Sequence, residues 1–494
     1  MVPNCADNTF FFLESLIENN PDFFHNFQNG NELHQVSCQL YITISKHAQS
    51  VSLSASADID FRRLKIQVNV TKNELEIITP NILSQLYGKE DEKYGDSSTQ
   101  LILSQLYGKE VVFESESCYA LCAYISSLSL SEEGNSLSLE ISANYITKCN
   151  SNLKFDNLLK YRNYCAVMFR ASWRLGDFEY EEHGQDSTLK ILKVKTRDNS
   201  PLRYCLVIFN TSKHLQEIKK NIHVINSLFS FLYRRDSKIS EIYVFRQYGE
   251  QAHNICCEKV FTAETIKYED RHYNSFPLPA LQRVPVFTTE KGEHNLFQSW
   301  EGFYQKYINH VNYLVDLNNA LCSSENYVPL RQVLLLCSDF IFSLWKDLIK
   351  NDKQVNKEEA SNYSKSIGSY LTFKKMISMA SFTCIDKEMD KLFSRILPPR
   401  TDYSFFKKKN SADNFAELIN RMYKSLCNVK NTSNTELEDY YNNLIPMYNL
   451  AMGAYNLLYL SMLYVYFNRD PNSARLWCIQ QGLMVDIIDN ELFS

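Results

Sequence analysis

Residues 128–139 read Leu-Ser-Leu-Ser-Glu-Glu-Gly-Asn-Ser-Leu-Ser-Leu, and this stretch indicates the architecture of the first half of the chain. Apolar residues stand two apart on both sides of a polar centre, which is the spacing of strands with one buried face. Gly134 and Asn135 are typical of the tight turn between two antiparallel strands. The stretch therefore predicts a β-hairpin.

The same alternation extends outward from this hairpin. It occurs upstream in residues 38–45 and 64–70, and the chain between residues 165 and 245 contains four further apolar segments of strand length. These four predicted strands are 165–171, 189–194, 202–209 and 239–245. Between the last two, apolar residues step by three and four, which predicts an amphipathic helix. Its apolar positions are Leu215, Ile218, Ile222, Ile225, Phe229 and Leu232.

The chain after about residue 294 has helical periodicity throughout. Prolines at 277, 279 and 285 mark an edge before it, because proline interrupts strand ladders. Five apolar stripes follow, and antiparallel helices bury such stripes against one another. They lie within residues 297–311, 333–344, 373–377, 415–426 and 450–467. We predict an α+β fold with a β-rich domain and a packed helix at residues 1–285, followed by an all-α helical bundle at residues 286–494.

An exact repeat interrupts the β-rich part. Ile-Leu-Ser-Gln-Leu-Tyr-Gly-Lys-Glu occurs at residues 82–90 and again at residues 102–110. A solenoid needs at least three units that drift in sequence. Two identical copies indicate a local duplication instead, and we interpret residues 80–112 as an insertion.

Composition limits the classes of function. The net charge of −5 leaves no global basic field, so a nucleic-acid site must be a local patch. Only 13 glycines occur and no phosphate-binding loop motif is present, and the sequence predicts no cofactor. His253 stands near Cys256 and Cys257, but zinc sites need further paired ligands, so no metal site is predicted. The 14 cysteines include no Cys-x-x-Cys pair, and we expect a reduced protein in which Cys337, Cys427 and Cys478, at apolar positions, are small buried side chains.

Two observations concern location. The N-terminus has no basic segment ahead of its phenylalanines, which favours a cytoplasmic protein without a secretory signal. Residues 450–467 form a mostly apolar run at the short end for crossing a bilayer, and they include Asn456 and Ser461. We interpret this run as a buried helix and predict no membrane association.

The strongest basic run is Lys407-Lys408-Lys409, with Arg400 nearby and Phe405-Phe406 beside it. Basic and aromatic side chains together can hold a single nucleic-acid strand through phosphate contacts and base stacking. A solvated surface loop is the alternative interpretation of the same residues.

Three segments, in their order and spacing, carry a resemblance to a known family. These are residues 206–232, the Phe297-Gln-Ser-Trp300 segment, and residues 425–436 followed by a long apolar helix. Together they resemble the ApeA-like HEPN proteins of bacterial abortive-infection defence, over about residues 165–467. The resemblance implies a helical bundle of the HEPN type, a homodimer, and an Arg-Asn-x-x-x-His nuclease motif at the third segment.

The motif positions in this chain are Lys430, Asn431 and Thr435, so only the asparagine matches. In the family, the histidine assists proton transfer and the arginine stabilises the phosphate. Threonine has no pKa near neutrality and cannot act as that base, and lysine lacks the bidentate fork of arginine. No histidine follows His310 anywhere in the chain.

We therefore expect a cytoplasmic HEPN-like binding or sensing protein, related to antiphage defence, that has lost the nuclease motif. Its partner would be RNA, or a phage or cellular protein. One alternative is a diverged metal-independent RNase acting in abortive infection, with Lys430, Asn431 and Glu436 or Glu438 in its cleft. The other alternative is a helical scaffold that mediates interactions.

Overall fold

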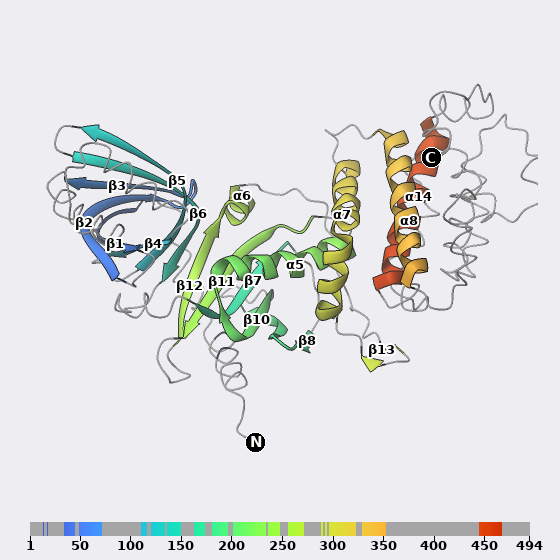
Figure 1. The fold of residues 1–494 in the computed structure, drawn as a ribbon, viewed down its shortest axis with the longest axis horizontal. Coiled ribbons are helices and arrows are strands. Elements are labelled where there is room, and N and C mark those ends of the chain that lie inside the picture. The colour runs from blue at the N-terminus through green and yellow to red at the C-terminus, as the bar shows by residue number, and fades with distance from the viewer. Residues whose placement is uncertain are drawn as a thin grey trace, which may run out of the picture. The chain divides into compact units, whose positions relative to one another are not determined.

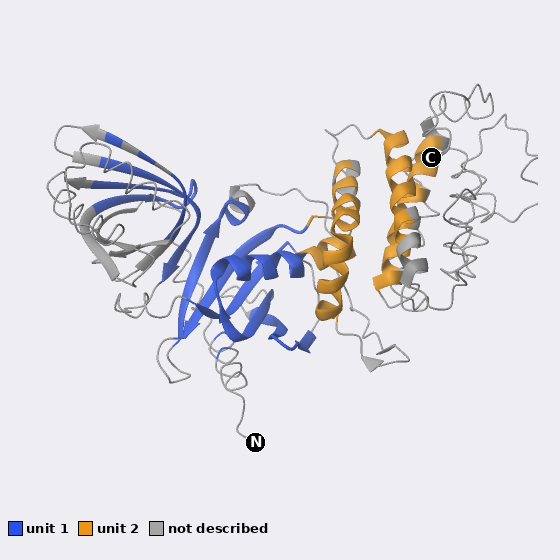
Figure 2. Ribbon diagram, in the orientation of Figure 1, with its two compact units in different colours: residues 1–226, 237–282 blue, residues 227–236, 283–494 orange. Residues whose placement is uncertain are grey.

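The structure is a computed structural model, and its chain divides into two compact units (Figure 2). Unit 1 comprises residues 1–226 and 237–282, and unit 2 comprises residues 227–236 and 283–494. The structure describes Leu13, Ile17 and residues 34–44, 49–71, 110–115, 120–133, 136–149, 163–172, 180–195, 201–233, 236–247, 255–270, 288–289, 292–293, 296–322, 329–351 and 444–466.

Six strands of unit 1 form a closed antiparallel sheet (Figure 1). They are β1 (His34–Ile44), β2 (Gln49–Asp60), β3 (Lys65–Thr71), β4 (Glu110–Ser115), β5 (Ala120–Glu133) and β6 (Ser136–Cys149). The ring closes because β3 pairs with both β2 and β6, while β1 pairs with both β2 and β4. The pairing of β5 with β6, up to Glu133 opposite Ser136, confirms the predicted hairpin strands, while Gly134 and Asn135 lie outside the described residues.

Alternation in the sequence explains which side of the closed sheet is buried. In β3, Ile66 and Val68 are fully buried, whereas the neighbouring Lys65 and Gln67 are exposed. Ile66 stands opposite Ile141 of β6, which is buried as well. Pairs of this kind provide the apolar contacts that hold one strand against the next.

Six more of the described strands continue the sheet from β6 as an open sheet. They are β7 (Tyr164–Ala171), β8 (Tyr180–His183), β9 (Ser187–Lys195), β10 (Pro201–Lys213), β11 (Ile239–Gln247) and β12 (Ile255–Thr262). Their order from β6 is β12-β11-β7-β10-β9-β8, and every pairing is antiparallel. One face carries a core of apolar side chains, including Leu13, Ile17, Met168, Leu206 and Phe245.

Helix α5 (Leu215–Tyr233) connects β10 to β11. Both strands lie antiparallel to β7, on its two sides, so they run parallel to each other and need a crossover connection. All six apolar positions predicted for this helix are buried. At its start, the backbone N–H of His214 donates to the Glu217 carboxylate at 3.3 Å, as in a capping box.

In its described residues, unit 2 contains three long helices and the short strands β13 (Thr288–Thr289) and β14 (Gly292–Glu293). The helices are α7 (Leu296–Cys322), α8 (Leu330–Asn351) and α14 (Leu444–Tyr466). Helix α14 packs mainly against α8, and its Tyr455 hydroxyl donates to the Leu314 carbonyl of α7 at 3.3 Å. None of the described helices is both long and apolar enough to cross a membrane.

The predicted all-α HEPN-like bundle is wrong. The described residues are dominated by one large antiparallel sheet with few helices, and α7, α8 and α14 do not form an all-α bundle domain. Periodicity identifies a helix but not whether several helices share one core, and α14 has few contacts with α7. The helices predicted at residues 373–377 and 415–426 lie outside the described residues, as does the repeat except for its final Glu110, which opens β4.

Candidate functional site

The residues that the sequence indicated as functional lie outside the described residues. This applies to Lys430, Asn431 and Thr435, to the basic residues Arg400 and Lys407–Lys409, and to His253. Among the described residues, no group of three or more His, Cys, Asp or Glu side chains could hold a metal ion. The candidate site described below is in unit 1, where β6 meets β12.

Two lysines face each other where the closed sheet joins the open sheet. Strand β12 pairs with the last five residues of β6, and this register places Lys259 directly opposite Lys148. The two side chains, here called the lysine pair, are both half-buried. Burial lowers the pKa of Lys148, and the positive charge of Lys259 lowers it further. The ammonium of Lys259 also lies 5.2 Å from the centroid of the Phe261 ring.

The lysine pair belongs to a row of side chains across four adjacent strands. Leu121 of β5 stands opposite Lys148, and Tyr243 of β11 stands opposite Lys259. The Tyr243 hydroxyl donates to the Glu241 carboxylate at 3.4 Å, and Tyr204 donates to the same oxygen at 2.6 Å. Burial, followed by the charge of Glu241, raises the pKa of both phenols, so they remain protonated donors. The tyrosine beside Lys259 is thus held in place.

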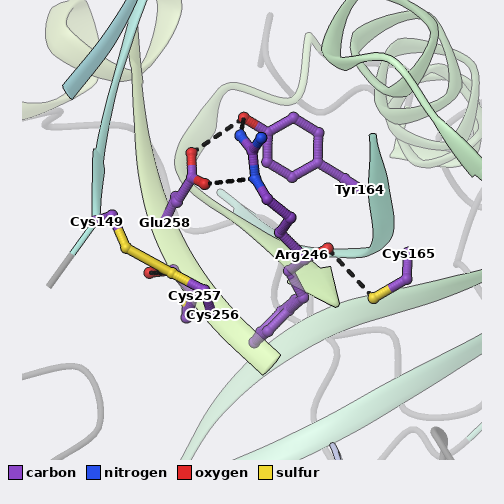
Figure 3. A network of polar contacts seen from close by, with 8 residues as sticks. Cys149, Tyr164, Cys165, Arg246, Cys256, Cys257 and Glu258 are labelled. Carbon is purple, nitrogen blue, oxygen red and sulfur yellow. Dashed lines mark hydrogen bonds and ion pairs between the residues drawn. A yellow bond between two sulfur atoms is a disulfide. The ribbon is translucent and has the colours of Figure 1, made fainter. Parts of the chain in front are cut away.

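A buried ion pair lies on the opposite side of β12 (Figure 3). The Arg246 Nε–H donates to Glu258 Oε1 at 2.9 Å, with side chains that are 6% and 2% exposed. Tyr164 completes the network: its hydroxyl donates to Glu258 Oε2 at 3.0 Å and accepts from Arg246 Nη2 at 2.8 Å. Buried charges need such partners, because an unpaired one is costly. The network fixes three neighbouring strands, β7, β11 and β12.

A disulfide between Cys149 and Cys256 lies beside this ion pair (Figure 3). Cys149 stands opposite Glu258, so Cys256 is its diagonal neighbour, and the Cα–Cα distance is 7.2 Å. Both side chains are 1% exposed. The prediction that all cysteines are reduced is therefore wrong for this pair. The partners are 107 residues apart in sequence, and only the strand pairing brings them together.

The neighbouring thiols are core side chains. Cys165 donates to the Phe245 carbonyl at 3.3 Å, and burial raises the pKa of this thiol to about 11. Burial also raises the pKa of Cys257 well above its ordinary value, followed by the effect of Glu258. Thiols with raised pKa values are protonated at neutral pH and are poor nucleophiles.

The last histidine of the chain has a defined contact in unit 2. His310 Nε2 lies 2.8 Å from Ser343 Oγ, and its ring lies 4.5 Å from that of Phe340. The Ser343 hydroxyl donates to the Phe340 carbonyl at 3.0 Å, so it accepts from the imidazole N–H. The Ser343 hydroxyl proton is donated to a carbonyl of its own helix, α8. Ser343 therefore links helices α7 and α8 and is not arranged as a nucleophile.

Comparisons with known proteins leave the family open. No family model matches the chain, and no curated protein matches it. Among solved structures, the red fluorescent protein lanRFPdam, exposed to prolonged X-ray irradiation, is 10% identical and covers 46% of this chain and 95% of its own, with a TM-score of 0.08. A TM-score this low shows no shared fold.

Proposed function

We propose that the protein is a cytoplasmic recognition protein that binds RNA through its phosphates at the lysine pair. The observation that carries this proposal is the register that sets Lys148 opposite Lys259 in half-buried positions. Phosphate contacts from lysine supply most of the sequence-independent affinity for nucleic acids. Since the chain has a net charge of −5, such a local site is the form that RNA binding would take.

The energetics of the lysine pair favour an anionic ligand. Like charges directly opposite each other on antiparallel strands are destabilising. Half-burial removes part of the water that would otherwise stabilise the Lys148 ammonium, as the lowered pKa reflects. A phosphate placed between the two ammonium groups would offset both costs, because charges interact more strongly where water is partly excluded.

A binding experiment on the full chain tests the proposal. Fluorescence anisotropy of a labelled single-stranded RNA should show weaker binding by the double variant Lys148→Gln/Lys259→Gln. The slope of log K against log salt should also fall by about 0.7 for each phosphate contact removed. The matched control is Lys193→Gln, an exposed lysine on β9 of the same unit. Equal affinities and equal salt slopes for the double variant and the unsubstituted chain would overturn the proposal.

The remaining expectations from the family resemblance stay predictions. These are a role in antiphage defence, a homodimer, and the loss of nuclease activity at Lys430, Asn431 and Thr435. The lysine pair is independent of them, since it lies in the β-rich unit and rests on strand register alone.

A further inference from the structure

The Cys149–Cys256 disulfide crosslinks the two strands that carry the lysine pair. Cys149 directly follows Lys148, and Cys256 lies three residues before Lys259. Side chains alternate along a strand, so the sulfur atoms and the ammonium groups project from opposite faces of the sheet. The disulfide therefore does not contact the lysine ammonium groups directly, and it acts on them only through the backbone.

The strand pairing at this point is short. Strand β12 pairs with β6 over five residues, Tyr145–Cys149, and within the described strands this is the only pairing that joins the closed sheet to the open sheet. Local opening of a strand end costs less free energy than global unfolding. A covalent link at the end of the ladder limits that opening, so it keeps Lys148 opposite Lys259.

We propose that the Cys149–Cys256 disulfide is a redox control on the RNA affinity of the lysine pair, an inference that rests on the function proposed above. In the oxidised chain the two lysines are held in register and bind phosphate together. In the reduced chain β12 separates from the end of β6 more often, and the two lysines then act singly. Disulfides in cytosolic proteins, where present, are usually transient or redox-sensing, which fits this role.

The chemistry is a thiol–disulfide exchange with a small dithiol or a dithiol protein. Two electrons and two protons pass to the Cys149–Cys256 bond, which becomes two thiols, while the external dithiol is oxidised to a disulfide. Both sulfur atoms are buried, so the attacking thiolate reaches them only when the strand end opens. Cys257 projects to the other face of β12 and is protonated, so it does not replace either partner.

The experiment measures RNA affinity of the full chain with and without dithiothreitol. We expect the oxidised chain to bind labelled single-stranded RNA about tenfold more tightly than the reduced chain, since reduction uncouples one of the two phosphate contacts. The variant Cys149→Ala/Cys256→Ala should bind weakly in both conditions. The matched control, Cys257→Ala, should respond to dithiothreitol as the unsubstituted chain does.

A second measurement does not depend on RNA. Hydrogen exchange of the peptide containing residues 255–262 should accelerate on reduction of the unsubstituted chain and should be fast in the double-alanine variant in both conditions. Unchanged exchange on reduction overturns the redox inference, as does mass spectrometry that finds Cys149 and Cys256 as free thiols in the chain isolated without reductant.

The two proposals fail in distinguishable ways. If Lys148→Gln/Lys259→Gln weakens binding but dithiothreitol has no effect, the redox inference is wrong and the RNA site stands. If the lysine substitutions have no effect on affinity, the proposed function is wrong, and the redox inference that rests on it falls too.

Discussion

Arg246 and Glu258 are buried, so their contribution to stability is best measured by substituting one of them at a time. A buried ion pair gains little over a well-packed apolar pair, because both charges lose hydration. Loss of a single partner is different, since it leaves a buried charge without compensation. Here Tyr164 satisfies both groups at once, and the guanidinium lies 4.5 Å from the centroid of its ring.

We predict that Arg246→Met lowers the free energy of unfolding by about 3–5 kcal/mol, because Glu258 keeps a buried charge. Urea unfolding monitored by circular dichroism measures this. The double variant Arg246→Met/Glu258→Gln should be more stable than Arg246→Met alone. As a control, Lys65→Met removes the exposed ion pair with Glu140 and should cost about 1 kcal/mol or less. Equal losses of unfolding free energy in Arg246→Met and Lys65→Met would contradict the prediction.

A second prediction concerns the pH dependence of stability through Cys165. The folded pKa of this thiol is raised from 9.0 to about 11, so above pH 9.0 the folded chain binds more protons than the unfolded chain. Stability should therefore fall as pH rises from about 9 to 11, by up to about 1.4 kcal/mol per pH unit from this group.

The variant Cys165→Ala isolates that contribution. Urea unfolding at pH 8, 9 and 10 should show a shallower loss of stability in the variant than in the unsubstituted chain. Parallel curves would show that Cys165 does not titrate in this range.

At the scale of elements, Trp300 joins helix α7 to the last turns of α5 within unit 2. Its indole N–H donates to Ser227 Oγ at 3.0 Å, and its ring lies 5.1 Å from that of Phe231. Trp300 is fully buried, which makes it an anchor of the aromatic cluster between the two helices. The sequence placed it at the start of the helical part.

We expect Trp300→Ala to destabilise unit 2 by about 3–5 kcal/mol, because a large cavity forms and Ser227 loses its donor. Differential scanning calorimetry would detect this as a lowered melting transition. Asn309→Ala, at an exposed position of the same helix, should change stability by about 0.5 kcal/mol or less. Equal melting temperatures for Trp300→Ala and Asn309→Ala would contradict the prediction.

The elements also show what the sequence could predict. The stripe of α5 and the β5–β6 hairpin depend on local periodicity, and both were found. Strand β12 was not predicted from the sequence. Glu258 is charged but buried, so the strand does not show the expected alternation of apolar and polar residues. The lysine pair and the Cys149–Cys256 disulfide depend on pairing between distant strands, for which no single segment carries a signal.

At the scale of the whole molecule, the family resemblance predicts a homodimer. Mass photometry at low ionic strength should then show a main peak at twice the chain mass of 57.7 kDa. Repeating the measurement with labelled RNA shows whether RNA binding alters the oligomeric state. A single peak at the mass of one chain, over a range of concentrations, would count against the dimer.

The family resemblance also predicts that the chain has no nuclease activity. RNA incubated with the protein should stay intact, because Thr435 cannot transfer a proton at the motif position where the family has histidine. Gel analysis of the RNA after incubation tests this. Specific cleavage that is abolished by Lys430→Ala and by Asn431→Ala would instead establish the diverged RNase.

Strand β6 belongs to both the closed and the open part of the sheet, since residues 136–142 pair with β3 and residues 145–149 pair with β12. A fragment that ends after β6 would therefore carry open backbone donors and acceptors on its last five residues, beside apolar side chains. Such an edge is a template for strand addition by another molecule. The closed sheet expressed without the open sheet should therefore aggregate, because the exposed edge of β6 can pair with another chain.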